Sequence, residues 1–260
     1  MDNALFIGST WVVLDEIDST NNYALGLLQQ GEAMAALPLE GTVVMAKHQT
    51  SGRGMRGNNW HSDRGAGLAM SVILYPTFLP LSRQFFLSQC VALGVCQWIN
   101  DIMAQKVCCQ IKWPNDIYVG TLKLGGILID NNVQNGQLAA SIVGIGININ
   151  QKEFPAFLAN PTSLYQLTGL HYDISALSKK LCHYLEKWYL LLKADKLSVI
   201  KAAYLENLYR YGQYARYRHG NTDIIARITD VAENGFLQLQ LLSDGEQRLF
   251  DLKEISYVFE

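Results

Sequence analysis

The feature that most constrains the fold is a glycine-rich loop that joins two strands without a helix between them. Residues 42–48 (TVVMAKH) and 67–75 (GLAMSVILY) are apolar and rich in strand-forming types, which predicts a strand on each side. The loop begins the spacing G-x-G-x-x-G at Gly52, as a dinucleotide-binding turn does. Such a turn must open a helix within a βαβ unit, and residues 57–65 (GNNWHSDRG) do not open one. The loop is therefore not a Rossmann nucleotide site.

The same loop carries two arginines and a tryptophan, Arg53, Arg56 and Trp60. Glycines let a backbone approach a ligand closely and direct its N–H groups toward it. Guanidinium groups bind phosphate or carboxylate oxygens, and an indole offers a flat face to a ring such as a purine. This composition indicates a lid over a phosphorylated, ring-bearing ligand. A flexible loop with solvated arginines is the alternative that this stretch alone leaves open.

A polar segment lies between the first predicted strand and the first predicted helix. Residues 11–17 form the strand, residues 18–22 (DSTNN) follow, and the helix is expected over 23–30. Ser19 and Thr20 thus lie where side-chain hydroxyls and free helix N–H groups come together. Capping of the helix is the interpretation that these residue types favour, and contact of one hydroxyl with a polar ligand is the alternative.

Two further regions present polar or bare surfaces at strand ends. The turn at residues 112–116 (KWPND) is pinned by its proline and presents an asparagine and an aspartate between two short strands. Lys123 follows in an apolar setting beside a Gly-Gly pair, from which its ammonium can reach an anionic ligand. In residues 144–150 (GIGININ) the glycines alternate and leave one strand face bare, with Asn148 at the strand end.

The rest of the chain predicts helices and then a small all-β part. Residues 82–103, 173–192 and 196–209 have the apolar periodicity of helices. Beyond them, short strands separated by Asn-Gly and Asp-Gly turns suggest a small barrel. We therefore expect one domain at residues 1–211 and a C-terminal domain at 212–260.

Charge and cysteine content narrow the class of protein. The net charge of −2 offers no global attraction to nucleic acid or to an anionic membrane. Five cysteines are an odd number without metal-ligand spacing, which favours reduced thiols in a cytoplasmic protein. The sequence contains neither a signal peptide nor an apolar run near the roughly 20 residues that a membrane helix requires.

Taken together, five motifs resemble those of the biotin protein ligases. In chain order they are residues 18–21 (DSTN), 52–60 (GRGMRGNNW), 112–116 (KWPND), 123–128 (KLGGIL) and 144–148 (GIGIN). Each motif is weak alone, but all five occur in the family's order across residues 11–150. The resemblance implies an α/β (α+β) fold, in which a class II synthetase-like catalytic domain with a mixed sheet precedes an SH3-like β-barrel.

The resemblance also implies an ATP-dependent ligase that works in two half-reactions. Biotin and ATP give biotinyl-5′-AMP and pyrophosphate with Mg²⁺, and the biotinyl group then passes to a lysine of a biotin carboxyl carrier protein domain. A lipoate–protein ligase or octanoyl transferase is one alternative, and a non-catalytic biotin- or adenylate-binding regulator is another. The loop and the KWPND turn favour biotin, and the retained Arg53, Asp116 and Lys123 favour catalysis.

The resemblance assigns individual residues to three overlapping sets, which would bind biotin, bind ATP and the adenylate, and take part in catalysis. The biotin set is Ser19, Thr20, Asn21, Gln49, Arg53, Gly54, Met55 and Lys123. The ATP and adenylate set is Gly52, Arg53, Arg56, Trp60, Asn115, Asp116, Lys123, Gly146 and Asn148. For catalysis, Arg53 and Lys123 would neutralise the phosphoryl charge, while Asp116 would bind Mg²⁺ and serve as base or orienting group in the transfer.

Two departures from the family pattern affect these expectations. Met55 stands where the family often has arginine, and Asn58-Asn59 replaces a more basic pair, so we expect a looser hold on the adenylate with Arg56 compensating. About ten residues precede the first strand, which leaves no room for the N-terminal helix-turn-helix domain of bifunctional relatives. We therefore expect neither DNA nor a membrane as partner, and a homodimer is an arrangement that the resemblance allows.

Overall fold

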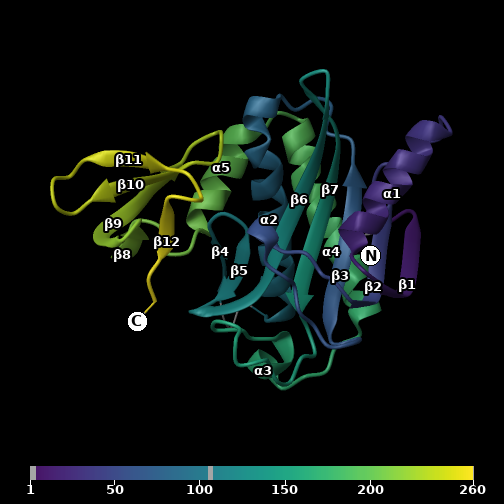
Figure 1. Cartoon of the computed structure of the whole chain (residues 1–260), viewed down its shortest axis with the longest axis horizontal. Coiled ribbons are helices and arrows are strands. Elements are labelled where there is room, and N and C mark those ends of the chain that lie inside the picture. Colours follow the sequence, from purple (N-terminus) through teal and green to yellow (C-terminus); the bar gives the residue numbers. More distant parts are fainter. Residues whose placement is uncertain (1–3, 105–107, 260) are drawn as a thin grey trace.

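A mixed seven-stranded sheet forms the larger part of the molecule (Figure 1). The computed structural model describes residues 4–104 and 108–259, without the side chain of Arg56. The strands are β1 (Trp11–Ile17), β2 (Val43–Gln49), β3 (Gly67–Leu74), β4 (Cys109–Lys112), β5 (Asp116–Val119), β6 (Leu122–Gln134) and β7 (Gln137–Asn148). Their order is β1-β2-β3-β7-β6-β5-β4, with β1 and β2 parallel and the other neighbours antiparallel. The predicted mixed-sheet α/β fold is confirmed.

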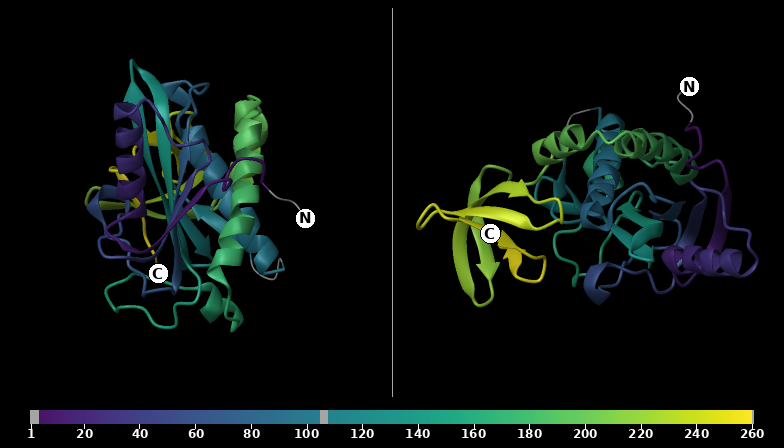
Figure 2. Two further views of the ribbon diagram at one scale, coloured as in Figure 1. Left: turned by 90° about the vertical axis from the view of Figure 1, so that its right-hand side faces the viewer. Right: turned by 90° about the horizontal axis from the view of Figure 1, so that it is seen from above.

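Helices cover both faces of this sheet (Figure 2). They are α1 (Thr20–Ala33), α2 (Phe85–Ile102), α3 (Leu164–Thr168), α4 (Ile174–Lys193) and α5 (Leu197–Glu206), with 3-10 turns η1 (Met55–Gly57) and η2 (Leu81–Arg83). On one face, Ala24 and Leu28 of α1 pack on a small apolar cluster from β2, β3 and β7. On the other face, α2 and α4 bury a much larger core. Helix α1 covers only part of its own face of the sheet. The rest of that face is left open for loops to lie against it.

A second, antiparallel sheet lies next to β4 and β5 (Figure 1). Its strands are β8 (Tyr214–His219), β9 (Thr222–Val231), β10 (Leu237–Leu241), β11 (Gln247–Phe250) and β12 (Ile255–Tyr257), in the order β11-β10-β9-β8-β12. The indole N–H of Trp113 in the KWPND turn donates to the carbonyl oxygen of Gly235 at 2.9 Å. This bond ties the turn to the second sheet. A domain boundary after residue 211 and closure into an SH3-like barrel stay predictions.

The structure differs from the sequence prediction at a few element ends. Strand β6 runs on to Gln134 instead of ending at Asp130, because β7 pairs with it from Gly125 to Gln134. Strand β12 was not expected at all. The cysteines are free as predicted, with Cys109 at the start of β4 buried and its neighbour Cys108, which precedes the strand, exposed. Within the described residues, no helix has the length and apolar character to cross a membrane.

One buried carboxylate fastens the segment that precedes β1. Glu186 of α4, only 4% exposed, accepts hydrogen bonds from three consecutive backbone N–H groups, those of Leu5, Phe6 and Ile7, at 2.6, 2.7 and 2.9 Å. We expect Glu186→Ala to lower the free energy of unfolding by about 3 kcal/mol, because it leaves these donors without an acceptor. Chemical denaturation measures the change. Lys180→Ala, at an exposed position of the same helix, is the control, and equal losses in the two variants would contradict this account.

Candidate active site

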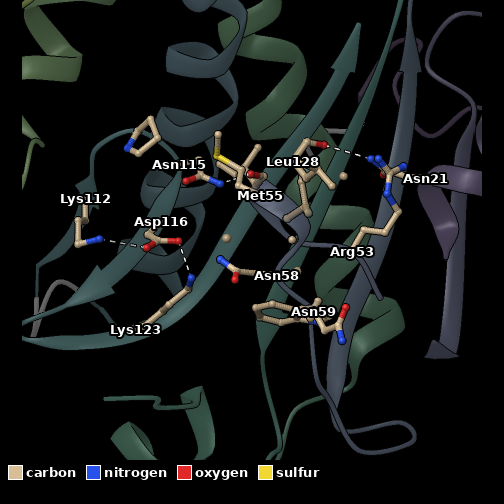
Figure 3. Close-up of a pocket in the computed structure, with 18 of the residues that line it drawn as sticks. Asn21, Arg53, Met55, Asn58, Asn59, Lys112, Asn115, Asp116, Lys123 and Leu128 are labelled. Atoms are coloured by element: carbon tan, nitrogen blue, oxygen red, sulfur yellow. Dashed lines mark hydrogen bonds and ion pairs between the residues drawn. The ribbon is translucent and has the colours of Figure 1, made fainter. Parts of the chain in front are cut away.

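The predicted motif regions meet around one cavity of about 330 Å³ on the α1 face of the sheet (Figure 3). Its walls come from the start of α1, the loop after β2, the KWPND turn, β6, β7 and β12. Most of the predicted site residues line it: Ser19, Thr20, Asn21, Gln49, Arg53, Gly54, Met55, Trp60, Asn115, Asp116, Lys123 and Gly146. Residues more than 120 positions apart in the sequence therefore share one site.

Two predicted site residues, Gly52 and Asn148, are not among the described residues that line the cavity, and a third, Arg56, cannot be placed. Gly52 lies against the backbone of Trp60 and leaves no space for a side chain, since an added Cβ would lie 2.6 Å from the carbonyl oxygen of Trp60. Asn148 is buried, and its Nδ2 donates to the carbonyl oxygen of Thr162 at 2.9 Å. The side chain of Arg56 lies outside the described part of the chain. The roles of these three residues at an adenylate stay predictions.

The glycine-arginine loop, residues 52–60, folds back on itself. The N–H of Trp60 donates to the carbonyl oxygen of Gly52 at 2.8 Å, and η1 forms the tip. Gly57 at the tip has φ 79°, in the left-handed region that glycine adopts without strain. The Trp60 ring lies over Gly146 of β7, where an added Cβ would be 2.7 Å from the ring. The bare strand face predicted from the alternating glycines thus receives the indole.

The start of α1 places a network of hydroxyl and amide groups at one end of the cavity. Thr20 donates from its backbone N–H and its hydroxyl to Gln49 Oε1, at 2.7 and 3.1 Å. The hydroxyl of Ser71 donates to Asn21 Oδ1 at 2.6 Å and lies 2.8 Å from the Thr20 hydroxyl. Ser19 is the N-cap residue of α1, yet its side chain makes no capping hydrogen bond. The capping interpretation is therefore wrong for Ser19, whose hydroxyl remains available to a ligand.

At the other end of the cavity, one carboxylate binds two ammonium groups (Figure 3). Asp116 Oδ1 lies 2.5 Å from Lys123 Nζ, and Asp116 Oδ2 lies 3.3 Å from Lys112 Nζ. Burial lowers the pKa of Lys112, and the nearby Asp116 partly opposes that shift. Among the described residues that line the cavity, Asp116 is the only acidic one. Two lysines for one carboxylate leave this end net positive, which suits an anionic ligand.

Comparison with known proteins decides the family. Residues 13–148, more than half of the chain, match the model of the biotin/lipoate A/B protein ligase family. The chain belongs to this family. The matched residues include almost all of the seven-stranded sheet and every described cavity-lining residue except Leu252 and the three residues of β12.

Individual ligases of this kind match over most of the chain. The bifunctional ligase/repressor BirA of Bacillus subtilis is 32% identical over 214 residues, which are 81% of this chain and 65% of that protein. The biotin--[acetyl-CoA-carboxylase] ligase of Paracoccus denitrificans is 27% identical over 88% of this chain and 93% of its own length. The solved structure of the Aquifex aeolicus biotin protein ligase in complex with biotin and ATP has 25% identity and a TM-score of 0.75, covering 95% of this chain and 98% of that one.

Part of the cavity wall of this biotin/lipoate ligase family member was not predicted from the sequence. The lining residues outside the predicted biotin, adenylate and catalytic sets are Asn58, Asn59, Met70, Lys112, Trp113, Pro114, Gly126, Ile127, Leu128, Gly144, Ile145, Leu252, Ile255, Ser256 and Tyr257. A signal for Lys112 was available, because a tight turn between β4 and β5 sets it directly opposite Asp116. No local signal identified Tyr257 of β12, whose ring centroid lies 4.9 Å from Lys112 Nζ.

Proposed function

We propose that this chain is an ATP-dependent biotin–protein ligase, which forms biotinyl-5′-AMP and then transfers the biotinyl group to a carrier lysine. The observation that carries the proposal is the polarity of the cavity, with an amide and hydroxyl network at one end and the Lys112–Asp116–Lys123 group at the other. Biotin has the same polarity, because a neutral ureido ring and a carboxylate lie at its opposite ends. The named relatives and the Aquifex complex support this choice within the family.

At the first end, the network suits a ureido ring, which offers two N–H donors and one carbonyl acceptor. Ser19 presents a hydroxyl that does not cap α1, and Asn21 presents an amide held by Ser71. A site built from polar groups in fixed positions discriminates strongly against ligands that leave those groups unpaired. Lipoate has a dithiolane ring and octanoate has an alkyl chain at this position, and neither can satisfy these groups.

At the second end, the first half-reaction brings two anions together. The biotin carboxylate attacks the α-phosphorus of ATP, a new P–O bond forms, and pyrophosphate leaves with the electrons of the broken bond. Negative charge builds on the phosphoryl oxygens, where fixed cations are most effective in a site that excludes water. Lys123 is the lysine with the more exposed side chain, 36% against 16% for Lys112, and it can turn from Asp116 to that charge.

In the second half-reaction, the amine of the carrier lysine attacks the carbonyl carbon of the mixed anhydride. The bond from that carbon to the phosphate oxygen breaks, AMP leaves, and the amine gives up a proton. Asp116 is the carboxylate placed to accept it once Lys123 has turned to the ligand. The glycine-arginine loop lines the cavity, with the ring of Trp60 against Gly146, and would protect the anhydride from water until the carrier arrives.

The residues of this site could supply only part of the coordination shell of a magnesium ion. Within the described part of the chain, no group of three or more acidic, histidine or cysteine side chains could hold a metal ion by itself. Mg²⁺ usually needs only one or two protein carboxylates, because substrate phosphates and water complete its shell. We infer that Asp116 would hold Mg²⁺ together with ATP, where the ion would shield phosphate charge.

We further propose that the acceptor is the biotin carboxyl carrier domain of a carboxylase. The name of the Paracoccus ligase gives acetyl-CoA carboxylase as the acceptor of that protein. The substrate assignment is tested by pyrophosphate release from ATP, with biotin, lipoate and octanoate offered separately. We expect release with biotin and none above background with the other two acids. Release with lipoate or octanoate would assign the chain to another branch of its family, and no release with any acid would favour a binding protein that does not catalyse.

A further inference from the structure

Arg53 points away from the lysine pair and is bound on the opposite side of the cavity (Figure 3). Its guanidinium donates to both oxygens of Asp130, from Nη1 at 2.9 Å and from Nη2 at 3.3 Å. Nη1 also donates to Asn22 Oδ1 in the first turn of α1, at 3.1 Å. A carboxylate gripped by both arms of the fork fixes the orientation of the guanidinium as well as its distance. Arg53 is therefore already engaged far from Asp116.

Asp130 has a second partner at the ureido end of the cavity. Asn21 Nδ2 donates to Asp130 Oδ2 at 2.9 Å, while Asn21 Oδ1 accepts from the Ser71 hydroxyl at 2.6 Å. An asparagine amide can turn over and exchange its donor with its acceptor. A carboxylate on one side and a hydroxyl donor on the other permit a single orientation. Asp130 does not itself line the cavity, and so it acts through Asn21 and Arg53.

Holding the Arg53 side chain also holds the stem of the glycine-arginine loop. Arg53 forms a backbone bridge with Asn59, and the N–H of Gly54 donates to the carbonyl oxygen of Asn58 at 2.7 Å. The other side of the stem is fixed by Trp60, whose ring lies over Gly146. The side chains of Arg53 and Asp130 remain 42% and 31% exposed, so the pair contributes little to stability by itself. Its consequence is geometric, because it joins the loop and α1 to β6.

We propose that Asp130 is a positioning residue, which orients the amide of Asn21 and anchors the glycine-arginine loop through Arg53. In this arrangement Arg53 holds the loop in place, and Lys123 neutralises the charge on the phosphoryl group. This inference rests on the proposed function, since biotin is the ligand whose binding Asn21 and the loop would control. A positioning role predicts weaker binding of biotin with little change in turnover once biotin is saturating.

The test uses Asp130→Ala, Arg53→Ala and the double variant in biotin-dependent pyrophosphate release. We expect each single variant to raise the KM for biotin by at least about tenfold, because each breaks the same contact. Asp130→Ala, which removes a residue outside the cavity lining, should leave kcat close to that of the unsubstituted chain. The double variant should be no worse than the more damaged single variant, because residues that act as one unit are not additive. Glu16→Ala removes a similar exposed partner of Arg64 outside the cavity and should change neither constant.

Thermal unfolding of every variant distinguishes a chain that does not fold from a folded chain in which Asn21 and the glycine-arginine loop are misplaced. If Asp130→Ala does not fold, Asp130→Asn, which keeps the shape and one acceptor oxygen, should still raise the KM for biotin. An Asp130→Ala or Asp130→Asn variant with unchanged KM would overturn the inference, and so would additive losses in the double variant. The unsubstituted chain is measured first. If it releases no pyrophosphate with biotin, the proposed function fails, whereas the inference fails only when that chain is active.

Discussion

Lys123→Ala is expected to lower biotin-dependent pyrophosphate release by at least about 100-fold while the chain remains folded. The side chain is 36% exposed at the edge of the cavity, so its removal opens no void in the core. Lys112 cannot replace it, because its ammonium lies near the rings of Tyr118 and Tyr257, at 5.4 and 4.9 Å from their centroids, and stays on Asp116. The developing phosphoryl charge would lose its one mobile cation.

Initial rates at saturating biotin and ATP measure this effect, and circular dichroism checks the fold. The matched control is Lys47→Ala, which removes a lysine that also has one carboxylate partner, Asp15, at 2.7 Å. That pair lies on β1 and β2 of the same sheet, with both side chains more than half exposed. The control should keep the activity of the unsubstituted chain. A Lys123→Ala variant with unchanged turnover would remove this lysine from the mechanism.

Asp116→Asn is expected to slow the transfer step by at least about 100-fold. An amide cannot take the proton that the carrier amine loses, and it leaves the ammonium groups of Lys112 and Lys123 without their shared counter-charge. The step is isolated by supplying biotinyl-5′-AMP and the carrier domain and following a single turnover. Asp15→Asn, the partner of the control lysine, should transfer at the normal rate. A normal rate for Asp116→Asn would exclude Asp116 as the base.

The parts of the site that could be predicted are those formed by residues that are consecutive in the sequence. The glycine-arginine loop, the KWPND turn and the alternating glycines of β7 each constrain their own backbone, and the cavity forms where they meet. The bare glycine face was a physical prediction, and the ring of Trp60 over Gly146 is its outcome. Short-range patterns succeed here because strand periodicity and glycine geometry act over only a few residues.

The parts that could not be predicted depend on contacts between distant residues. Strand β12 has only three residues, and its place against the cavity is set by pairing with β8. The orientation of Arg53 depends on Asp130, which lies 77 positions later in a strand that was expected to end there. Ser19 has the residue type of a helix cap, but the position of its hydroxyl follows from the packing of α1 on the sheet. Local propensity gives no information on any of these contacts.

The most direct test of the central claim is the mass of a biotin carboxyl carrier domain after incubation with this chain, biotin, ATP and Mg²⁺. The account predicts a gain of one biotinyl group on a single lysine, which requires ATP and disappears when that lysine is replaced by arginine. It also predicts that lipoate in place of biotin produces no gain. A carrier that keeps its original mass with biotin, or that gains a lipoyl group instead, would contradict the account.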